Sequence, residues 1–219
     1  MTPVVIAAAA VAPQAWRNGG GQTRELFTWP AQAGPWRLRI SRADIDADGP
    51  FSAFPGVTRW FAVLRGRGVA LTLDGQRHDV MAHGDALCFD GAQAPHCHLL
   101  DGPTQDLNLM AVGGESLMAR VQPGVAWSGA WAMRGLYTRV AGQWHSARAQ
   151  CAVDADSLLW LQAADTGAWT FTPAAGGGDG AIDANDRSGG NCDGDAGHDG
   201  VDNDGGGIPA WWLGFTPKE

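Results

Sequence analysis

The sequence has few positive charges and no long apolar run, and both absences narrow the classes of protein to which it can belong. Its 219 residues include 15 Lys and Arg against 23 Asp and Glu, for a formal net charge of -8. A general nucleic-acid binder should instead carry a basic stripe. The apolar stretch at residues 1–11 is too short to span a membrane and lacks the basic residues of a secretory signal. We therefore expect a cytoplasmic protein with no nucleic-acid partner and no membrane partner.

Almost all of the net negative charge lies in one segment. Residues 176–207 contain eight Asp, one Arg, many Gly and few apolar residues. Such a composition cannot bury enough surface to offset the entropy of ordering. We interpret residues 174–207 as an insertion in a hairpin connection. Its acidic stretch from Asp193 suggests weak calcium binding. The alternative is a solvated linker, because His198 stands at a position where an EF-hand requires Gly.

Cysteine is also scarce, with four residues at positions 88, 97, 151 and 192. Without a secretory signal they are expected to be free thiols. Cys88 lies between Leu87 and Phe89, a context typical of an inert core thiol. The sequence also lacks the Gly-x-Ser-x-Gly motif of many hydrolases. Nucleophilic catalysis therefore has little support.

Short apolar or alternating runs separated by glycine-rich turns fill the chain. Asp74-Gly75 between two such runs is a strong signal for a two-residue hairpin. Regular strand spacing without an amphipathic helix in the first half predicts an all-β sandwich or barrel. Two successive groups of strands suggest two halves, at residues 1–112 and 113–219. The expected strands are residues 4–6, 36–42, 59–64, 69–73, 76–80, 86–89, 104–112, 116–121, 131–140, 157–163, 168–172 and 208–215.

Residues 36–42 show the alternation of a half-buried strand most clearly. Leu38 and Ile40 fall on one face of this strand, whereas Arg37, Arg39 and Ser41 fall on the other. The pattern predicts that the two faces of the strand meet different surroundings.

A polar, glycine-rich turn at residues 18–25 carries the most distinctive chemistry. Its three consecutive glycines permit close backbone approach, and their N–H groups can converge on an anion. Asn18, Thr23 and Arg24 add directional donors. The alternative is a glycine-rich bulge with a surface salt bridge.

Two further segments place polar groups where a ligand or an internal partner must satisfy them. Arg42 and Arg59 bracket a segment rich in Phe, Pro and Gly, and an arginine beside aromatic rings needs an acidic partner or ligand. In residues 104–112, Asp106 and Asn108 share one strand face, and polar groups facing an interior are costly unless hydrogen-bonded. The alternative is that both arginines pair with internal acids such as Asp44 or Asp106.

The His96-Cys97-His98 stretch is the candidate metal site, because both imidazoles fall on one strand face. No Glu follows at a natural spacing for a third ligand, so surface histidines are the alternative. We expect no metal and no other cofactor.

Taken together, the stretches at residues 16–25, 39–43, 49–59, 64–68 and 102–110 resemble the HutD/Ves family in order and spacing. The resemblance covers roughly residues 3–173 and, less clearly, 208–216. It implies a bicupin, with two cupin-like antiparallel β-barrels packed together in one chain. It also implies an association with bacterial histidine utilisation, or a stress-related role in the Ves branch, without an established enzymatic activity. The insertion at 174–207 departs from the family pattern.

The resemblance implies a pocket lined by residues that match the family motifs, namely Asn18, Thr23, Arg24, Arg42, Arg59, Asp106 and Asn108. Arginines with amide and hydroxyl donors suit a small dicarboxylate. Our leading hypothesis is a non-catalytic binding or regulatory protein for a small anionic metabolite such as N-formylglutamate. The alternatives are a cupin enzyme, either metal-dependent through His96 and His98 or metal-free through Asp106, and a protein–protein module or homodimer with Trp residues at its interface.

Overall fold

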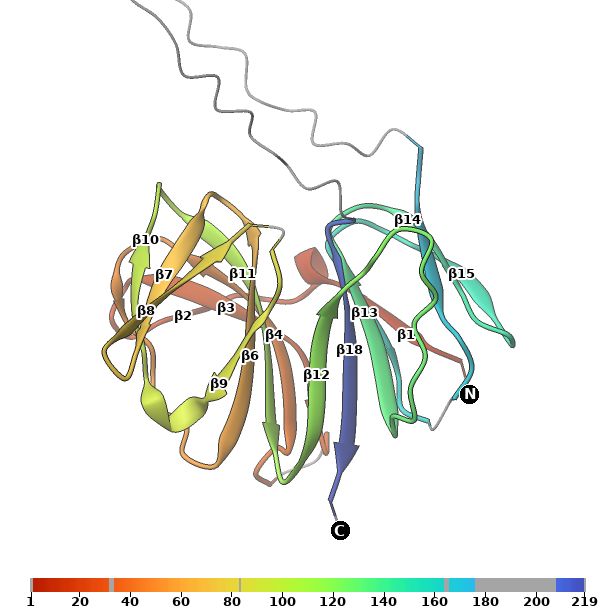
Figure 1. Ribbon diagram of the computed structural model, residues 1–219, viewed down its shortest axis with the longest axis horizontal. Coiled ribbons are helices and arrows are strands. Elements are labelled where there is room, and N and C mark those ends of the chain that lie inside the picture. The colour runs from red at the N-terminus through yellow and green to blue at the C-terminus, as the bar shows by residue number, and fades with distance from the viewer. Residues whose placement is uncertain (1, 32–33, 83, 164–165, 176–207, 219) are drawn as a thin grey trace, which may run out of the picture.

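The structure is a computed structural model that describes residues 2–218 except 32–33, 83, 164–165 and 176–207. Residues of the first half form two facing antiparallel sheets (Figure 1). The six-stranded sheet has the order β2 (Gln14–Ala15), β3 (Gly21–Trp29), β4 (Leu38–Ile45), β11 (Thr104–Val112), β6 (Val57–Arg65) and β9 (Leu87–Asp90). The four-stranded sheet has the order β5 (Gly49–Pro50), β10 (His96–Leu99), β7 (Gly68–Leu73) and β8 (Gln76–Met81).

The second half repeats this arrangement with a larger and a smaller sheet. The five-stranded sheet has the order β1 (Val4–Ala7), β16 (Ser157–Leu161), β13 (Met133–Thr138), β18 (Ala210–Pro217) and β12 (Gly114–Arg120). The three-stranded sheet has the order β15 (Gln150–Val153), β14 (Gly142–His145) and β17 (Thr170–Pro173). Two short 3-10 turns, η1 (Ala8–Ala10) and η2 (Gly91–Gln93), interrupt the strands. Strand β1 begins the chain but pairs with β16, so the N-terminus is part of the second half (Figure 1).

The sheets stack in layers, and three apolar clusters lie between them. The first joins the two larger sheets, with residues such as Ile40 and Leu109 from one and Trp160 and Leu213 from the other. The second fills the space between the two sheets of the first half. The third does the same in the second half, where Trp residues supply much of its volume. Because the first cluster combines residues of both halves, each half has an internal core and also buries apolar surface against the other half.

The all-β class predicted from the sequence is confirmed. The four sheets of the described residues have open edges, so they do not show the two closed barrels of the expected bicupin. The Asp74-Gly75 hairpin is confirmed: both residues have positive φ values, of 48° and 77°, and Leu73 pairs with Gln76. Within the described part of the chain, no helix is long and apolar enough to cross a membrane.

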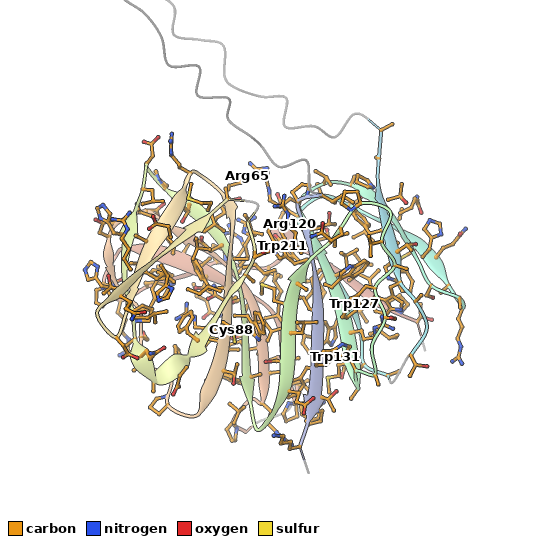
Figure 2. The ribbon with its side chains drawn as sticks, viewed as in Figure 1. Arg65, Cys88, Arg120, Trp127, Trp131 and Trp211 are labelled. Carbon is orange, nitrogen blue, oxygen red and sulfur yellow. The ribbon has the colours of Figure 1, made fainter. Side chains whose placement is uncertain are left out.

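Two sequence predictions need correction. The expected turn at residues 18–25 ends earlier, because β3 begins at Gly21 and its residues pair with β4. Cys88 is exposed rather than in the core, since on edge strand β9 its neighbour Phe89 points inward and Cys88 points outward (Figure 2). Cys97 and Cys151 are free thiols, as expected. The fourth cysteine and the predicted calcium-type loop lie outside the described residues.

Candidate functional site

A tight hairpin between β2 and β3 forms the rim of the site. The Trp16 backbone N–H donates to the Gly21 carbonyl at 2.9 Å, and the Trp16 indole N–H donates to the Thr23 hydroxyl at 2.8 Å. Asn18 closes the turn by accepting from the Gly20 N–H at 3.1 Å. A Cβ atom on Gly21 would lie 2.3 Å from the Asp44 carbonyl oxygen, so only glycine fits there. The hairpin therefore holds residues 16–18 over the edge of the sheet.

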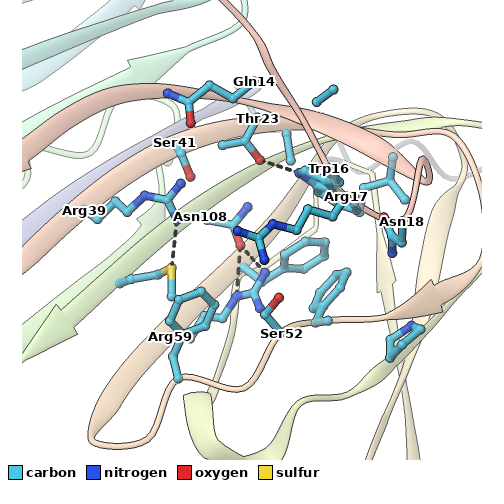
Figure 3. A pocket seen from close by; sticks show the side chains of 18 residues that line it. Gln14, Trp16, Arg17, Asn18, Thr23, Arg39, Ser41, Ser52, Arg59 and Asn108 are labelled. Carbon is cyan, nitrogen blue, oxygen red and sulfur yellow. Dashed lines mark hydrogen bonds between the residues drawn. The ribbon is translucent and has the colours of Figure 1, made fainter.

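Below this rim lies a cavity of about 820 Å³ between the two sheets of the first half (Figure 3). Its lining combines guanidinium, amide and hydroxyl groups with a wall of aromatic and other apolar side chains. The lining residues are Gln14, Ala15, Trp16, Arg17, Asn18, Thr23, Arg39, Ser41, Ala43, Ile45, Pro50, Phe51, Ser52, Phe54, Arg59, Phe61, Asn108 and Met110. None of these described residues is Asp, Glu, His or Cys.

Arg59 is the deepest cation of the cavity, with only 8% of its surface exposed. Its Nε and Nη2 donate to the Asn108 Oδ1 at 3.1 and 2.7 Å, and its guanidinium lies over the Phe51 ring at 4.3 Å. Burial, followed by the nearby charge of Arg39, lowers the pKa of Arg59 to about 10, so the group stays charged at neutral pH. No carboxylate of the described residues lies within 4.0 Å of it. Within the described part of the chain, Arg59 is therefore a buried cation that hydrogen-bonds an amide oxygen and contacts no carboxylate.

The other two arginines of the cavity have different surroundings. Arg39 donates from Nε to Glu25 Oε2 at 2.8 Å, which offsets its charge. Arg17 is exposed on the hairpin and extends over the cavity in the view of Figure 3. The cavity thus combines one compensated cation with two that have no carboxylate partner among the described residues.

Asp106 lies in the same interior but does not line the cavity. Its side chain is fully buried, Oδ2 accepts from the Thr104 hydroxyl at 2.9 Å, and Oδ1 has no partner. Burial raises the pKa of this carboxyl well above its usual value, against the opposing effects of Thr104 and Arg59. The neutral acid is favoured because an isolated carboxylate in an apolar interior is costly.

Arg24 and Arg42 lie on the opposite face of the six-stranded sheet. Alternation along β4 directs Ser41 to the cavity and Arg42 away from it, and Arg24 sits directly across from Arg42 on β3. Both arginines pair with Asp44, at 2.7 and 3.2 Å. The alternative that the sequence left open, a pairing with an internal acid such as Asp44, is therefore present for Arg42, whereas no ion pair of Arg59 is found among the described residues.

The structure thus separates the seven predicted site residues into three groups. Four of them line the cavity: Asn18, Thr23, Arg59 and Asn108. Asp106 is buried in the same interior, and the remaining two arginines lie on the other face. Sequence reasoning did not nominate Arg17 or Arg39, although the alternation of residues 36–42 had already placed Arg39 and Ser41 on one face.

The candidate metal ligands do not form a metal site in the described residues. His96 and His98 point outward from β10, and the His98 Nδ1 contacts the Asp48 carboxylate. No group of three or more His, Cys, Asp or Glu side chains comes together in the part of the chain that the structure describes.

The fold and the cavity define an all-β protein with arginines in the lining of an interior cavity. A sequence profile of the HutD family matches residues 8–180, and the chain belongs to that family. An uncharacterised 21.2 kDa protein in the hutC 3′ region of Pseudomonas putida is 41% identical over 98 residues, covering 43% of this chain and 50% of that protein. Protein Ves of Citrobacter koseri is 36% identical over 97 residues, with the same coverage. The chain spans about half the length of the curated relatives that it matches.

Solved structures extend the similarity over most of the chain. A conserved protein of unknown function from Pseudomonas aeruginosa PAO1 is 26% identical, with a TM-score of 0.71, over 79% of this chain and 93% of that one. HutD from Pseudomonas fluorescens SBW25, in a formate condition, has a TM-score of 0.65 at 23% identity over 78% of this chain and 98% of that one. The second similarity is one of fold.

Proposed function

We propose that this protein is a non-catalytic binding protein for a small carboxylate, which it holds in the cavity around Arg59. The observation that carries the proposal is the buried Arg59 guanidinium, which has no carboxylate of the described residues within 4.0 Å. A buried charge without a counter-charge costs several kcal/mol, and an anionic ligand removes that cost. The planar guanidinium also matches a carboxylate in shape and donor geometry.

The cavity lining also supports a ligand with a second anionic group. Arg17 on the rim and Arg59 in the interior are two separate cations, whereas Glu25 already offsets Arg39. Thr23, Asn108 and the backbone of the hairpin add polar partners along the wall. A small dicarboxylate such as N-formylglutamate fits this distribution of charge.

The absence of acid–base groups from the lining favours binding over catalysis. General acid–base chemistry needs a titratable group within hydrogen-bond reach of the substrate, and no described lining residue is Asp, Glu, His or Cys. Asp106, the candidate of the metal-free enzyme alternative, does not line the cavity. The enzyme hypotheses are therefore less well supported than binding.

Family membership links the proposal to histidine utilisation. The matched relative from Pseudomonas putida is named for the hutC region, and the solved neighbour from Pseudomonas fluorescens is named HutD. We propose a regulatory role in histidine breakdown for this chain, with a cytoplasmic location.

We also propose that the two sheet pairs are divergent cupin barrels, since each half packs a larger sheet on a smaller one. A homodimer stays a prediction that light scattering tests.

Calorimetric titration with N-formylglutamate, glutamate, urocanate and formate tests the binding proposal. We expect saturable binding that Arg59→Gln weakens by more than the ~1 kcal/mol of an exposed ion pair. Arg77→Gln is the matched control, since Arg77 forms an exposed pair with Asp79 on β8. Arg17→Gln should weaken the dicarboxylate more than formate. No binding to the folded protein at millimolar ligand would refute the proposal, as would unchanged affinity in Arg59→Gln.

A further inference from the structure

A second cavity lies on the opposite face of the six-stranded sheet from the Arg59 cavity. Its volume is about 490 Å³, and most of its lining is polar or charged. The lining residues are Gln22, Arg24, Arg42, Asp44, Asp46, Arg65, Pro103, Thr104 and Gln105. The two cavities share no lining residue. We propose that this second cavity binds a small oxyanion independently of the first.

The first argument is the crowding of positive charge around one carboxylate. Arg24 and Arg42 lie directly opposite each other on neighbouring strands, an arrangement that is unfavourable for like charges. Asp44 accepts from Arg24 Nη1 at 2.7 Å, from Arg42 Nη2 at 3.2 Å and from Gln22 Nε2 at 2.9 Å. One carboxylate therefore serves two guanidinium groups and an amide. The arginine side chains are only 18% and 11% exposed, so solvent screens their repulsion weakly.

Arg65 adds a third cation whose ion pair is long. Its Nη2 lies 3.8 Å from Asp156 Oδ2, beyond hydrogen-bond distance, and Asp156 also faces Arg139 at 3.9 Å. Arg65 is half-exposed and lies where the two halves of the molecule meet (Figure 2). The cavity lining thus holds three arginines and two aspartates, one of which is saturated by donors.

The second argument is a buried donor without an acceptor beside the cavity. Arg42 Nε is buried and has no hydrogen-bond partner. The Tyr137 hydroxyl of the second half is also buried, and it lies beside the Arg42 side chain. Burial raises the pKa of Tyr137, so its hydroxyl remains a neutral donor rather than a counter-ion. Neither group relieves the excess of positive charge.

An oxyanion supplies what the cluster lacks, a negative charge with several acceptor atoms. Carboxylates, sulfate and phosphate share this chemistry and take paired hydrogen bonds from arginine. An anion placed by Arg24 and Arg65 would also sit beside the Arg65–Asp156 contact that joins the two halves. Binding there should stabilise the folded protein as well as neutralise the arginines.

The test titrates Arg59→Gln protein separately with phosphate, sulfate and acetate at constant ionic strength, because this variant disables the first cavity. Calorimetry and the thermal midpoint report binding. We expect saturable millimolar binding of at least one anion in Arg59→Gln, and a loss of about tenfold in affinity when Arg24→Gln or Arg65→Gln is added. Arg77→Gln, added instead, should change nothing.

The outcomes separate the two sites. Absence of saturable binding in Arg59→Gln would overturn the second site and leave the first untouched. Equal affinity with and without both added substitutions would also overturn it. Arg65 is half-exposed, so Arg65→Gln decides the question if Arg24→Gln fails to fold, and circular dichroism identifies that case. Which of the three anions binds distinguishes a carboxylate from a tetrahedral oxyanion.

Discussion

Replacing Asp106 by Asn should remove a destabilising pH dependence from the protein. Burial raises the pKa of this carboxyl in the folded state well above the usual 3.8, so the folded protein keeps the proton to a higher pH than the unfolded chain does. The unfolded chain releases the proton near that usual value. Stability from this group is therefore complete at pH values below about 3.8 and declines as the pH rises towards the folded-state pKa. The sign is opposite to that of a salt-bridged aspartate.

The magnitude follows from the linkage of one proton. Between the two pKa values the free energy of unfolding should fall by about 1.4 kcal/mol for each pH unit. Asn cannot ionise, yet its amide oxygen can still accept from the Thr104 hydroxyl that now bonds Oδ2 at 2.9 Å. Asp106→Asn should therefore lack this decline, and its stability relative to the wild type should increase with pH.

Urea unfolding of both proteins at several pH values from 4.5 upward measures the difference directly. Urea is preferred to guanidinium chloride, because a salt would screen Arg59 and compete for anion sites. Asp79→Asn, an exposed aspartate paired with Arg77, is the matched control and should follow the wild-type curve. Parallel stability curves for Asp106→Asn and the wild type would refute the assignment of a neutral buried acid.

Three further substitutions test a hydrogen bond at the rim of the site and the packing of the core. Trp16→Phe removes the indole hydrogen bond to Thr23, and it should cost about 0.5–1.5 kcal/mol in urea unfolding and weaken carboxylate binding in calorimetry. Gly135→Ala would place a Cβ 2.3 Å from the Trp160 ring, so we expect a loss of about 1–3 kcal/mol, and unchanged stability would contradict this close contact. Leu109→Ala, in the cluster between the halves, should lower the free energy of unfolding by about 2–5 kcal/mol. Unfolding should remain a single transition by fluorescence and circular dichroism, and separate transitions would show that the halves unfold independently.

The local sequence pattern was sufficient to predict the strands whose alternation or turn residues are clear. The alternation of Leu38 and Ile40 with Arg39 and Ser41 predicted the two faces of β4, and the structure places the first pair in the core between the halves. The Asp74-Gly75 pair predicted its hairpin, because few other residues accept positive φ at both positions.

Weaker sequence patterns did not predict where a strand begins or which side chains are buried. Strand β3 begins inside the predicted glycine-rich turn, because pairing with β4 outweighs the local preference of Gly21 for a turn. Cys88 has apolar neighbours in sequence, but on an edge strand it faces solvent. Alternation along a strand shows that two faces differ, and it does not show which face a neighbouring element covers.

The sequence by itself determined that this is an all-β protein of the HutD family, since strand periodicity, turn residues and family motifs are local features of the chain. It also identified Arg59, Asn108, Asn18 and Thr23 as candidates for one site. Only the tertiary structure decided which arginines share a cavity. Arg42 and Arg59 lie on different strands, and their faces depend on the register of β4, β11 and β6 and on the sheets that cover each side. That register separates one predicted anion site into an interior cavity at Arg59 and a polar cluster where the halves meet.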